Sequence, residues 1–337
     1  MVHRVGLIGL GNIGTVHARN VSENPDLKLT AVFDPVADRQ REFAEKYGAR
    51  APATLGELLK DPEIDAVIVA SSTNTHSEVA VAAAKAGKAI YCEKPIDLSL
   101  EKARATVKAI SETSAPVMMG FNRRYDESHA SLHHAVRDQS IGKLQILQMT
   151  SRGPNSIFTP DYIRVSGGFY RDKGVHFFDL MRFISGDEAV EISAMGACLS
   201  DAFIGEMGDV DTAIMCVRLA RGGLCQIDNT RRATYGYDER IEVLGTNGLI
   251  ESGRAPRISV IRTQGSDFVA AGIHQDIFQR FGRTYAASMA AFTRFLSNPR
   301  EPVPTLKDGL AAQILAEAAT RSAREDRIVH LSEIERQ

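Results

Sequence analysis

The sequence contains no long apolar run, no cluster of basic residues and no closely spaced pair of cysteines. No apolar stretch approaches the roughly 18 residues of a membrane span, which argues against a membrane protein. A formal net charge of −2 without a basic run argues against a surface that binds nucleic acid by neutralising phosphates. The four cysteines, Cys92, Cys198, Cys216 and Cys225, form no C-x-x-C motif, so reduced thiols in a cytoplasmic protein are the simpler interpretation. The first apolar run starts at once, which leaves no room for a signal or transit peptide.

Two common catalytic patterns are also missing. No G-x-S-x-G motif is present, which argues against a serine nucleophile of that type. His129 and His133 are four residues apart on a predicted helix, as in half a zinc site. No glutamate follows His129, and no third ligand has a recognisable spacing. We therefore expect a solvated helix face at these histidines and no metal.

A glycine-rich turn near the N-terminus organises the rest of the chain. An apolar run, residues 5–10, leads into Gly9-Leu10-Gly11-Asn12-Ile13-Gly14, and a helix-like pattern follows. Gly9 permits a tight turn, Gly11 lets the backbone approach phosphates, and Gly14 lets the helix pack closely on the strand. The free N–H groups at the helix N-terminus then face the anion. The sequence therefore predicts a dinucleotide held by Gly9, Gly11, Asn12 and Ile13.

A carboxylate stands where a dinucleotide requires one. A second apolar run, residues 27–33, ends at Asp34, about 20 residues past the last glycine, at the position of the ribose partner. Because proline and valine follow, no arginine stands beside Asp34. Arg39 and Arg41 lie further along the predicted helix and would reach it only in an unusual pose. The carboxylate therefore predicts NAD rather than NADP, and the alternative is an ordinary turn with a solvated aspartate.

The order of strands and helices changes near residue 121. Before it, strands alternate with helices, which predicts a Rossmann domain with a parallel, doubly wound sheet at residues 1–121. Beyond it, strands follow one another, which predicts an α+β domain with a large, mostly antiparallel open sheet at residues 122–337. The C-terminal helix is a candidate to pack back on the first domain. The second domain should contain strands 143–151, 190–199, 212–219, 224–230, 240–244 and 258–262 and helices 124–138, 173–184, 277–296 and 308–324.

Small polar residues follow the predicted buried strand at residues 66–70. They are Ser71, Ser72, Thr73, Asn74, Thr75 and His76. Parallel sheets bind ligands at the carboxyl ends of their strands, so these side chains are candidates for cofactor contacts. Helix capping by Thr73, Asn74 or Thr75 is the alternative, and both uses can coexist.

Two further groups are candidates for catalysis. Lys94, in Cys92-Glu93-Lys94-Pro95, follows a predicted buried strand and points toward the cofactor crevice, with a surface lysine as the alternative. Asp172 and His176 are four residues apart on a predicted helix, close enough to hydrogen-bond. A carboxylate beside an imidazole raises its basicity, as a general base for a hydroxyl proton requires. The spacing alone favours the alternative, in which Asp172 caps the helix and His176 fills a polar core position.

Together these motifs resemble the Gfo/Idh/MocA oxidoreductase family over essentially the whole chain. The similarity is carried by GLGNIG, Asp34, the STNTH segment, CEKP, and DKGVH in the second domain. Within the family, GFNRRYD (120–126), DYI (161–163), SGGFYRD (166–172) and RRATYGYD (231–238) are most similar to the inositol 2-dehydrogenases. The resemblance implies Lys94, Asp172 and His176 as catalytic residues, and NAD contacts that extend to Glu93 and Lys94.

The resemblance also implies NAD-dependent oxidation of a cyclic polyol, with the three catalytic residues, Arg123, Asp179 and Tyr235 beside the polyol. It implies a homotetramer formed through the open sheet face. Inositol enzymes commonly read R-D-P or R-N-P where this chain has Gly153, so a hydrogen bond to the substrate is missing unless Asn155 replaces it. Phe177 stands where a polar or acidic residue is usual. The alternatives are another polyol or sugar (scyllo-inositol, an amino-inositol or a monosaccharide) and an NAD-binding regulator that has lost catalysis.

Overall fold

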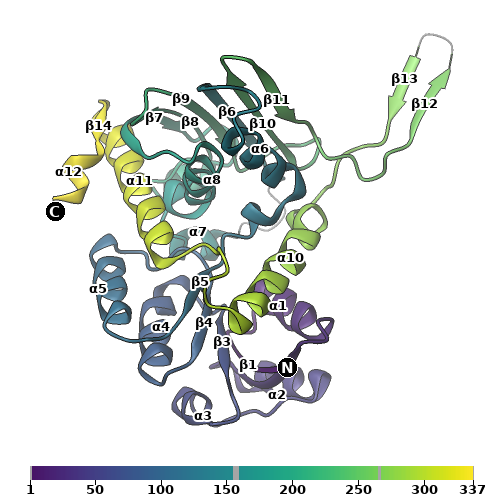
Figure 1. Ribbon diagram of the computed structural model, residues 1–337, viewed down its shortest axis with the longest axis vertical. Helices are drawn as coiled ribbons and strands as arrows, with labels where there is room; N and C mark the ends of the chain where they lie inside the picture. Colours follow the sequence, from purple (N-terminus) through teal and green to yellow (C-terminus); the bar gives the residue numbers. More distant parts are fainter. Residues whose placement is uncertain (1, 155–158, 265–266, 337) are drawn as a thin grey trace. The chain divides into compact units, whose positions relative to one another are not determined.

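The computed structural model describes residues 2–154, 159–264 and 267–336 (Figure 1). The chain divides into two compact units. Unit 1 consists of Met1–Asn122 and Thr284–Gln313, and unit 2 of Arg123–Arg283 and Ile314–Gln337. Residues 284–313, which the order of elements assigns to the second domain, belong to unit 1 by their contacts. Within that unit, for example, the hydroxyl groups of Tyr91 and Ser288 lie 3.0 Å apart.

Unit 1 contains a five-stranded parallel sheet in the order β2-β1-β3-β4-β5. Its strands are β1 (His3–Ile8), β2 (Leu27–Phe33), β3 (Ala66–Val69), β4 (Ala89–Cys92) and β5 (Val117–Met119). Every residue of β3 and β4 is buried, as expected for inner strands of a parallel sheet. Because β2 and β3 pair with opposite edges of β1, the strand order reverses there, where such sheets bind ligands. The prediction of a parallel, doubly wound sheet is confirmed.

Local sequence signals set the helix ends of unit 1. Gly48 ends α2 in the left-handed conformation, with φ 63°. Thr54 caps α3, and Ser99 caps α5, through side-chain oxygens that accept backbone N–H groups. Figure 1 shows α4 and α5 side by side. The helices are α1 (Asn12–Ser22), α2 (Ala37–Tyr47), α3 (Leu55–Lys60), the 3₁₀ turn η1 (Thr73–Thr75), α4 (His76–Lys85) and α5 (Leu100–Ser111).

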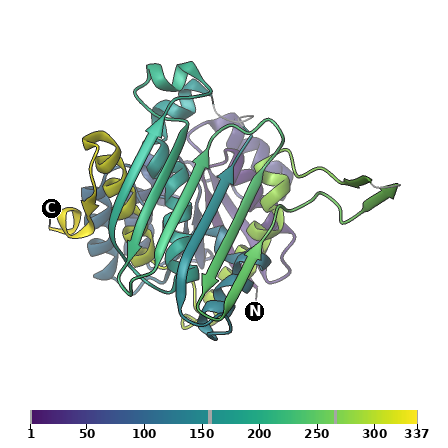
Figure 2. The ribbon, with the colours of Figure 1, turned by 90° about the horizontal axis from the view of Figure 1, so that it is seen from above.

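Unit 2 contains a seven-stranded sheet in the order β11-β10-β6-β9-β8-β7-β14, seen face-on in Figure 2. Strands β6 and β9 pair in parallel, and the other described pairs are antiparallel, which confirms a mostly antiparallel sheet. Buried and exposed residues alternate along β8, so one sheet face is covered and the other is open. The strands are β6 (Leu144–Arg152), β7 (Ala189–Ala197), β8 (Thr212–Leu219), β9 (Leu224–Thr230), β10 (Asp238–Gly245), β11 (Gly248–Ser252) and β14 (Val329–His330).

The helices of unit 2 include α6 and α8, which pack against each other, and α8 also contacts β6. Two long helices, α10 and α11, contribute residues to both units. Within the part of the chain that the structure describes, no helix is long and apolar enough to cross a membrane. The remaining elements are η2 (Asn122–Tyr125), α6 (Glu127–Arg137), α7 (Pro160–Val165), the π-helical turn η3 (Tyr170–Gly174), α8 (Val175–Ser185), α9 (Ala202–Glu206), α10 (Ile277–Ser297), α11 (Leu306–Glu325) and α12 (Leu331–Glu335).

Three predicted elements of unit 2 differ from the structure. The strand predicted at 258–262 is wrong: β12 (Ile261–Gln264) pairs instead with β13 (Asp267–Ala270) in a hairpin that stands away from the sheet in Figure 2. The helix predicted from residue 124 begins at Glu127, because the carboxylate of Asp126 accepts two backbone N–H groups and caps it. The helix predicted from residue 173 begins inside the π-helical turn η3, which hydrophobic periodicity does not reveal.

Candidate functional site

The turn between β1 and α1 requires glycine at two positions. Gly9 has φ +90°, and a Cβ built on it would lie 2.3 Å from the Cα of Ser71. A Cβ on Gly14 would lie 2.1 Å from the carbonyl oxygen of Gly9, so the helix packs there directly on the turn. A Cβ on Gly11 would meet nothing within 4 Å, which leaves open space at the N-terminus of α1. This backbone fits the pyrophosphate of a dinucleotide, for which the helix N-terminus supplies N–H groups.

Asp34 closes this turn at the end of β2. Its carboxylate accepts the backbone N–H of Leu10 at 2.8 Å and that of Val36 at 2.9 Å. The guanidinium of Arg39 lies 3.3 Å from the same carboxylate and is about half exposed. The expectation that Arg39 would reach Asp34 only in an unusual pose is therefore wrong, because one turn of α2 brings it within ion-pair distance. The end of β2 thus carries a carboxylate and a guanidinium together.

The loops after β3 and β4 are joined by a buried histidine. The ring nitrogens of His76 lie 2.8 Å from the carbonyl oxygen of Pro95 and 3.0 Å from that of Ser71. Burial lowers the pKa of His76, which favours the neutral ring. Glu93 is also buried and lies 2.8 Å from a ring nitrogen of His17 on α1. His76 and Glu93, both predicted to contact the cofactor, thus make contacts that hold the loops and α1 in place.

The other loop residues predicted at the cofactor are more accessible. Ser72 and Asn74 are exposed, and the Ser71 hydroxyl lies 2.7 Å from that of Thr75. Thr75 precedes α4 but makes no side-chain capping hydrogen bond, so the capping alternative is not realised there. Lys94 follows β4 and is partly exposed, and its backbone N–H donates to Glu93. Ser72 and Asn74 remain candidates for cofactor contacts, and Lys94 for contact with cofactor or substrate.

Asp172 lies in the η3 turn and has two strong partners within unit 2. The hydroxyl of Tyr162 on α7 donates to one carboxylate oxygen at 2.8 Å, and the guanidinium of Arg231 donates to the other at 2.9 Å. Arg231 follows β9 and is fully buried. Asp172 therefore does not act as the N-cap predicted by the alternative interpretation. Its carboxylate, four residues before His176 in the chain, forms an ion pair with Arg231. His176 stays partly exposed between the fully buried Val175 and Phe177.

The residues predicted beside the polyol have partners within unit 2. Arg123 is buried, donates to Glu239 and to the Tyr237 hydroxyl, and lies over the ring of Phe177. Asp179 is buried and accepts two hydrogen bonds from Arg124. The Tyr235 hydroxyl donates to Asp238 at 2.7 Å. Asn155 lies outside the described residues. These contacts give no support to the prediction that Arg123 and Asp179 touch the substrate. The side chain of Tyr235 is 46% exposed and stays a candidate for substrate contact.

The two histidines of α6 also differ from expectation. His129 is buried, with one ring nitrogen 3.0 Å from the carbonyl oxygen of Arg123 and the other 3.5 Å from Glu239. His133 stacks on Phe183 with 4.1 Å between ring centroids. The predicted solvated helix face is therefore wrong, because α6 presents both rings to its neighbours. Among the described residues, no group of three His, Cys, Asp or Glu side chains is placed to hold a metal.

Two family models match this chain. A model described as an oxidoreductase family with an NAD-binding Rossmann fold covers residues 3–121, and a GFO/IDH/MocA C-terminal domain covers residues 129–251. The fold and the glycine turn thus define an NAD-binding oxidoreductase. The chain belongs to the Gfo/Idh/MocA family, which confirms the resemblance drawn from its motifs.

Individual relatives span the full chain. The myo-inositol 2-dehydrogenase of Thermotoga maritima is 41% identical over 333 residues, covering 98% of this chain and 99% of the relative. The NAD-dependent scyllo-inositol 2-dehydrogenase of Bacillus subtilis is 32% identical over 332 residues, covering 97% and 96%. The crystal structure of a myo-inositol dehydrogenase from Corynebacterium glutamicum gives a TM-score of 0.92 at 36% identity, covering 98% of this chain and 99% of that chain.

Proposed function

We propose that this oxidoreductase oxidises a secondary hydroxyl of a cyclic polyol, with myo-inositol as the first substrate to test. The observation that carries the proposal is the carboxylate of Asp172, held by Arg231 and Tyr162 four residues before the partly exposed His176. Relatives at 41% and 32% identity carry the names of myo-inositol and scyllo-inositol dehydrogenases. Another inositol, an amino-inositol or a monosaccharide remains the second candidate, because Gly153 lacks a side chain that could select the isomer.

The proposed chemistry assigns a separate task to each residue. NAD supplies the hydride acceptor when bound. His176 takes the proton of the substrate hydroxyl, and the carboxylate of Asp172 stabilises the imidazolium that forms. Lys94 donates to the reacting oxygen and stabilises its developing negative charge. A regulator that had lost catalysis would need none of these groups, so their presence together favours an enzyme.

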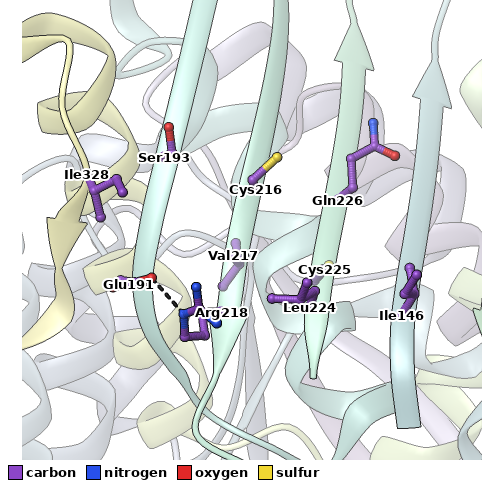
Figure 3. Close-up of a pocket in the computed structure, with 10 residues that line it drawn as sticks. All are labelled: Ile146, Glu191, Ser193, Cys216, Val217, Arg218, Leu224, Cys225, Gln226 and Ile328. Carbon is purple, nitrogen blue, oxygen red and sulfur yellow. Dashed lines mark hydrogen bonds and ion pairs between the residues drawn. The ribbon is translucent and has the colours of Figure 1, made fainter. Parts of the chain in front are cut away.

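We also propose a cytoplasmic homotetramer that assembles through the open face of the unit 2 sheet. Large apolar side chains are exposed there, and strand register places Ile146 beside Leu224 and Met195 beside Ile214. Figure 3 shows Ile146, Cys216 and Leu224 on neighbouring strands of this face. Large apolar side chains exposed on an open sheet face are typical of an interface between protein chains. All four cysteines are free, as suits a reducing compartment.

A substrate panel tests the proposed activity. We expect NADH formation with myo-inositol first and scyllo-inositol second, and steep losses with deoxy-inositols, because a site that binds hydroxyls leaves its own groups unpaired with such analogues. Gly153→Asn should shift the preference among isomers. A Cβ at this position would lie 3.3 Å from the Tyr237 ring, a contact that a small ring movement relieves. Turnover confined to an aldose or a hydroxy acid would leave only the family assignment.

The pairing of Asp34 with Arg39 predicts a cofactor switch. The wild-type enzyme should prefer NAD, because Asp34 repels a 2′-phosphate. Asp34→Asn keeps an oxygen for the Leu10 N–H but releases Arg39 to bind phosphate, so the ratio of NAD to NADP kcat/KM should fall about 10–100-fold, the worth of a charged hydrogen bond. The control Asp34→Asn/Arg39→Ala should lose most of this gain in NADP use. Preference of the wild-type enzyme for NADP would overturn the role of Asp34.

A further inference from the structure

The ammonium of Lys173 lies beside the space that a side chain at position 153 would occupy. A Cβ built on Gly153 would stand 3.6 Å from Nζ of Lys173. Nζ donates to the hydroxyl of Ser151 at 3.3 Å and lies 5.8 Å from the ring centroid of Tyr237. Lys173 directly follows Asp172 in the η3 turn, and part of its side chain is exposed. A cationic donor therefore occupies the place of the side chain that residue 153 lacks.

The charges around Lys173 leave it as an additional cation. Glu239 pairs with Arg123, and Asp172 pairs with Arg231, so each nearby carboxylate already has an arginine. Within the described part of the chain, Nζ donates a long hydrogen bond to Ser151, although an ammonium carries three donors. Burial, and then the charge of Arg123, lower the pKa of Lys173 to about 7, so the ammonium form with its three donors dominates below that pH.

We propose that Lys173 contacts the substrate and selects the charge of the ring substituent nearest Gly153. The ammonium donates to an acceptor oxygen there, so a hydroxyl or a carboxylate is accepted and an amine is rejected. An ammonium has no acceptor, and a second ammonium within contact distance meets both repulsion and an unmatched donor. This inference rests on the proposed oxidation of a cyclic polyol and names the residue that separates inositols from amino-inositols.

The test compares wild type, Lys173→Met and Lys173→Glu at about pH 6, where Lys173 is protonated, on myo-inositol and on amino-deoxy-inositols that differ in the position of the amine. Lys173→Met should raise KM for inositol about tenfold with a smaller change in kcat, as expected for loss of one charged hydrogen bond. For at least one amino isomer, kcat/KM relative to inositol should rise tenfold or more, and further in Lys173→Glu. Lys173→Arg, which keeps the charge, should retain the wild-type order of substrates. Melting temperatures establish that each variant is folded.

The outcomes separate this inference from the proposed function. Inositol turnover with no amino isomer gaining threefold in either variant overturns the role of Lys173 and leaves the function standing. If the wild-type enzyme oxidises no inositol, the proposed function is wrong. Charge selection by Lys173 is then measured as the rise in melting temperature that each of the same compounds gives in the presence of NADH. A preference for inositols over amino-inositols in this binding assay, lost in Lys173→Met, would still support contact between Lys173 and the polyol. Absence of protection by every compound overturns it, because no polyol is then bound for Lys173 to select.

Discussion

Replacing His176 with alanine is expected to lower kcat by about 10²–10⁴, the usual share of general acid–base catalysis. The side chain is partly exposed at the start of α8, whereas its neighbours Val175 and Phe177 are fully buried, so α8 should stay packed without the imidazole. Asp172 would keep its hydrogen bonds to Tyr162 and Arg231. Assays with saturating NAD and polyol measure the loss of kcat, and melting curves of the same samples measure whether the variant stays folded.

His133→Ala is the matched control for this variant. His133 is also a partly buried histidine on a helix, but it stacks on Phe183 and has no proposed role in catalysis. Its removal should lower the melting temperature slightly and leave the activity of the folded protein unchanged. Lys94→Ala should lose activity while the protein stays folded, because the proposed partner of its ammonium is the substrate. If His176→Ala unfolds the protein but the folded fraction keeps full activity, His176 is a core residue.

The parts of the site that the sequence predicted well depend on local backbone requirements. The turn requires glycine at position 9, where φ is +90°, and at position 14, where the helix packs on the turn. The spacing of these glycines is visible in the sequence alone. The apolar run at residues 27–33 coincides with β2 for the same reason, since a continuous apolar run bounded by polar residues is also a local feature. The prediction of NAD binding came from these features.

The partners of the proposed site residues could not be predicted in the same way. Arg231 lies 59 residues from Asp172, and Glu239 lies 116 residues from Arg123. Ion pairs across such separations leave no periodic pattern, and only the placement of β9, β10 and η3 in one unit brings them together. The one available signal was an arginine following a predicted strand, in a segment already noted for its resemblance to inositol enzymes. The π-helical turn at Asp172 likewise changes the geometry that four-residue spacing assumes.

The ion pair of Arg123 and Glu239 predicts the largest loss of stability in unit 2. Both side chains are buried, and the guanidinium also lies 4.3 Å from the centroid of Phe281 and 5.0 Å from that of Phe177. Burial alone would lower the pKa of Arg123, but the carboxylate of Glu239 raises it above its usual value. A guanidinium is effectively always charged in proteins, so Arg123 stays charged when this partner is removed. Removing the carboxylate therefore leaves a cation enclosed by aromatic rings without its counter-charge.

Glu239→Gln should destabilise unit 2 by about 3–5 kcal/mol, the cost of breaking a buried ion pair by removing one partner. For a unit of this size, the apparent melting temperature should fall by about 6–20 °C. Asp38→Asn is the control, because the pair of Asp38 with Arg41 is exposed and should contribute no more than about 1 kcal/mol. The double variant Arg123→Met/Glu239→Leu should recover most of the loss, since it removes both charges and restores apolar packing. Equal melting temperatures for Glu239→Gln and Asp38→Asn would show that Arg123 finds another partner. The ion pair with Glu239 would then not be needed to hold η2 against β10.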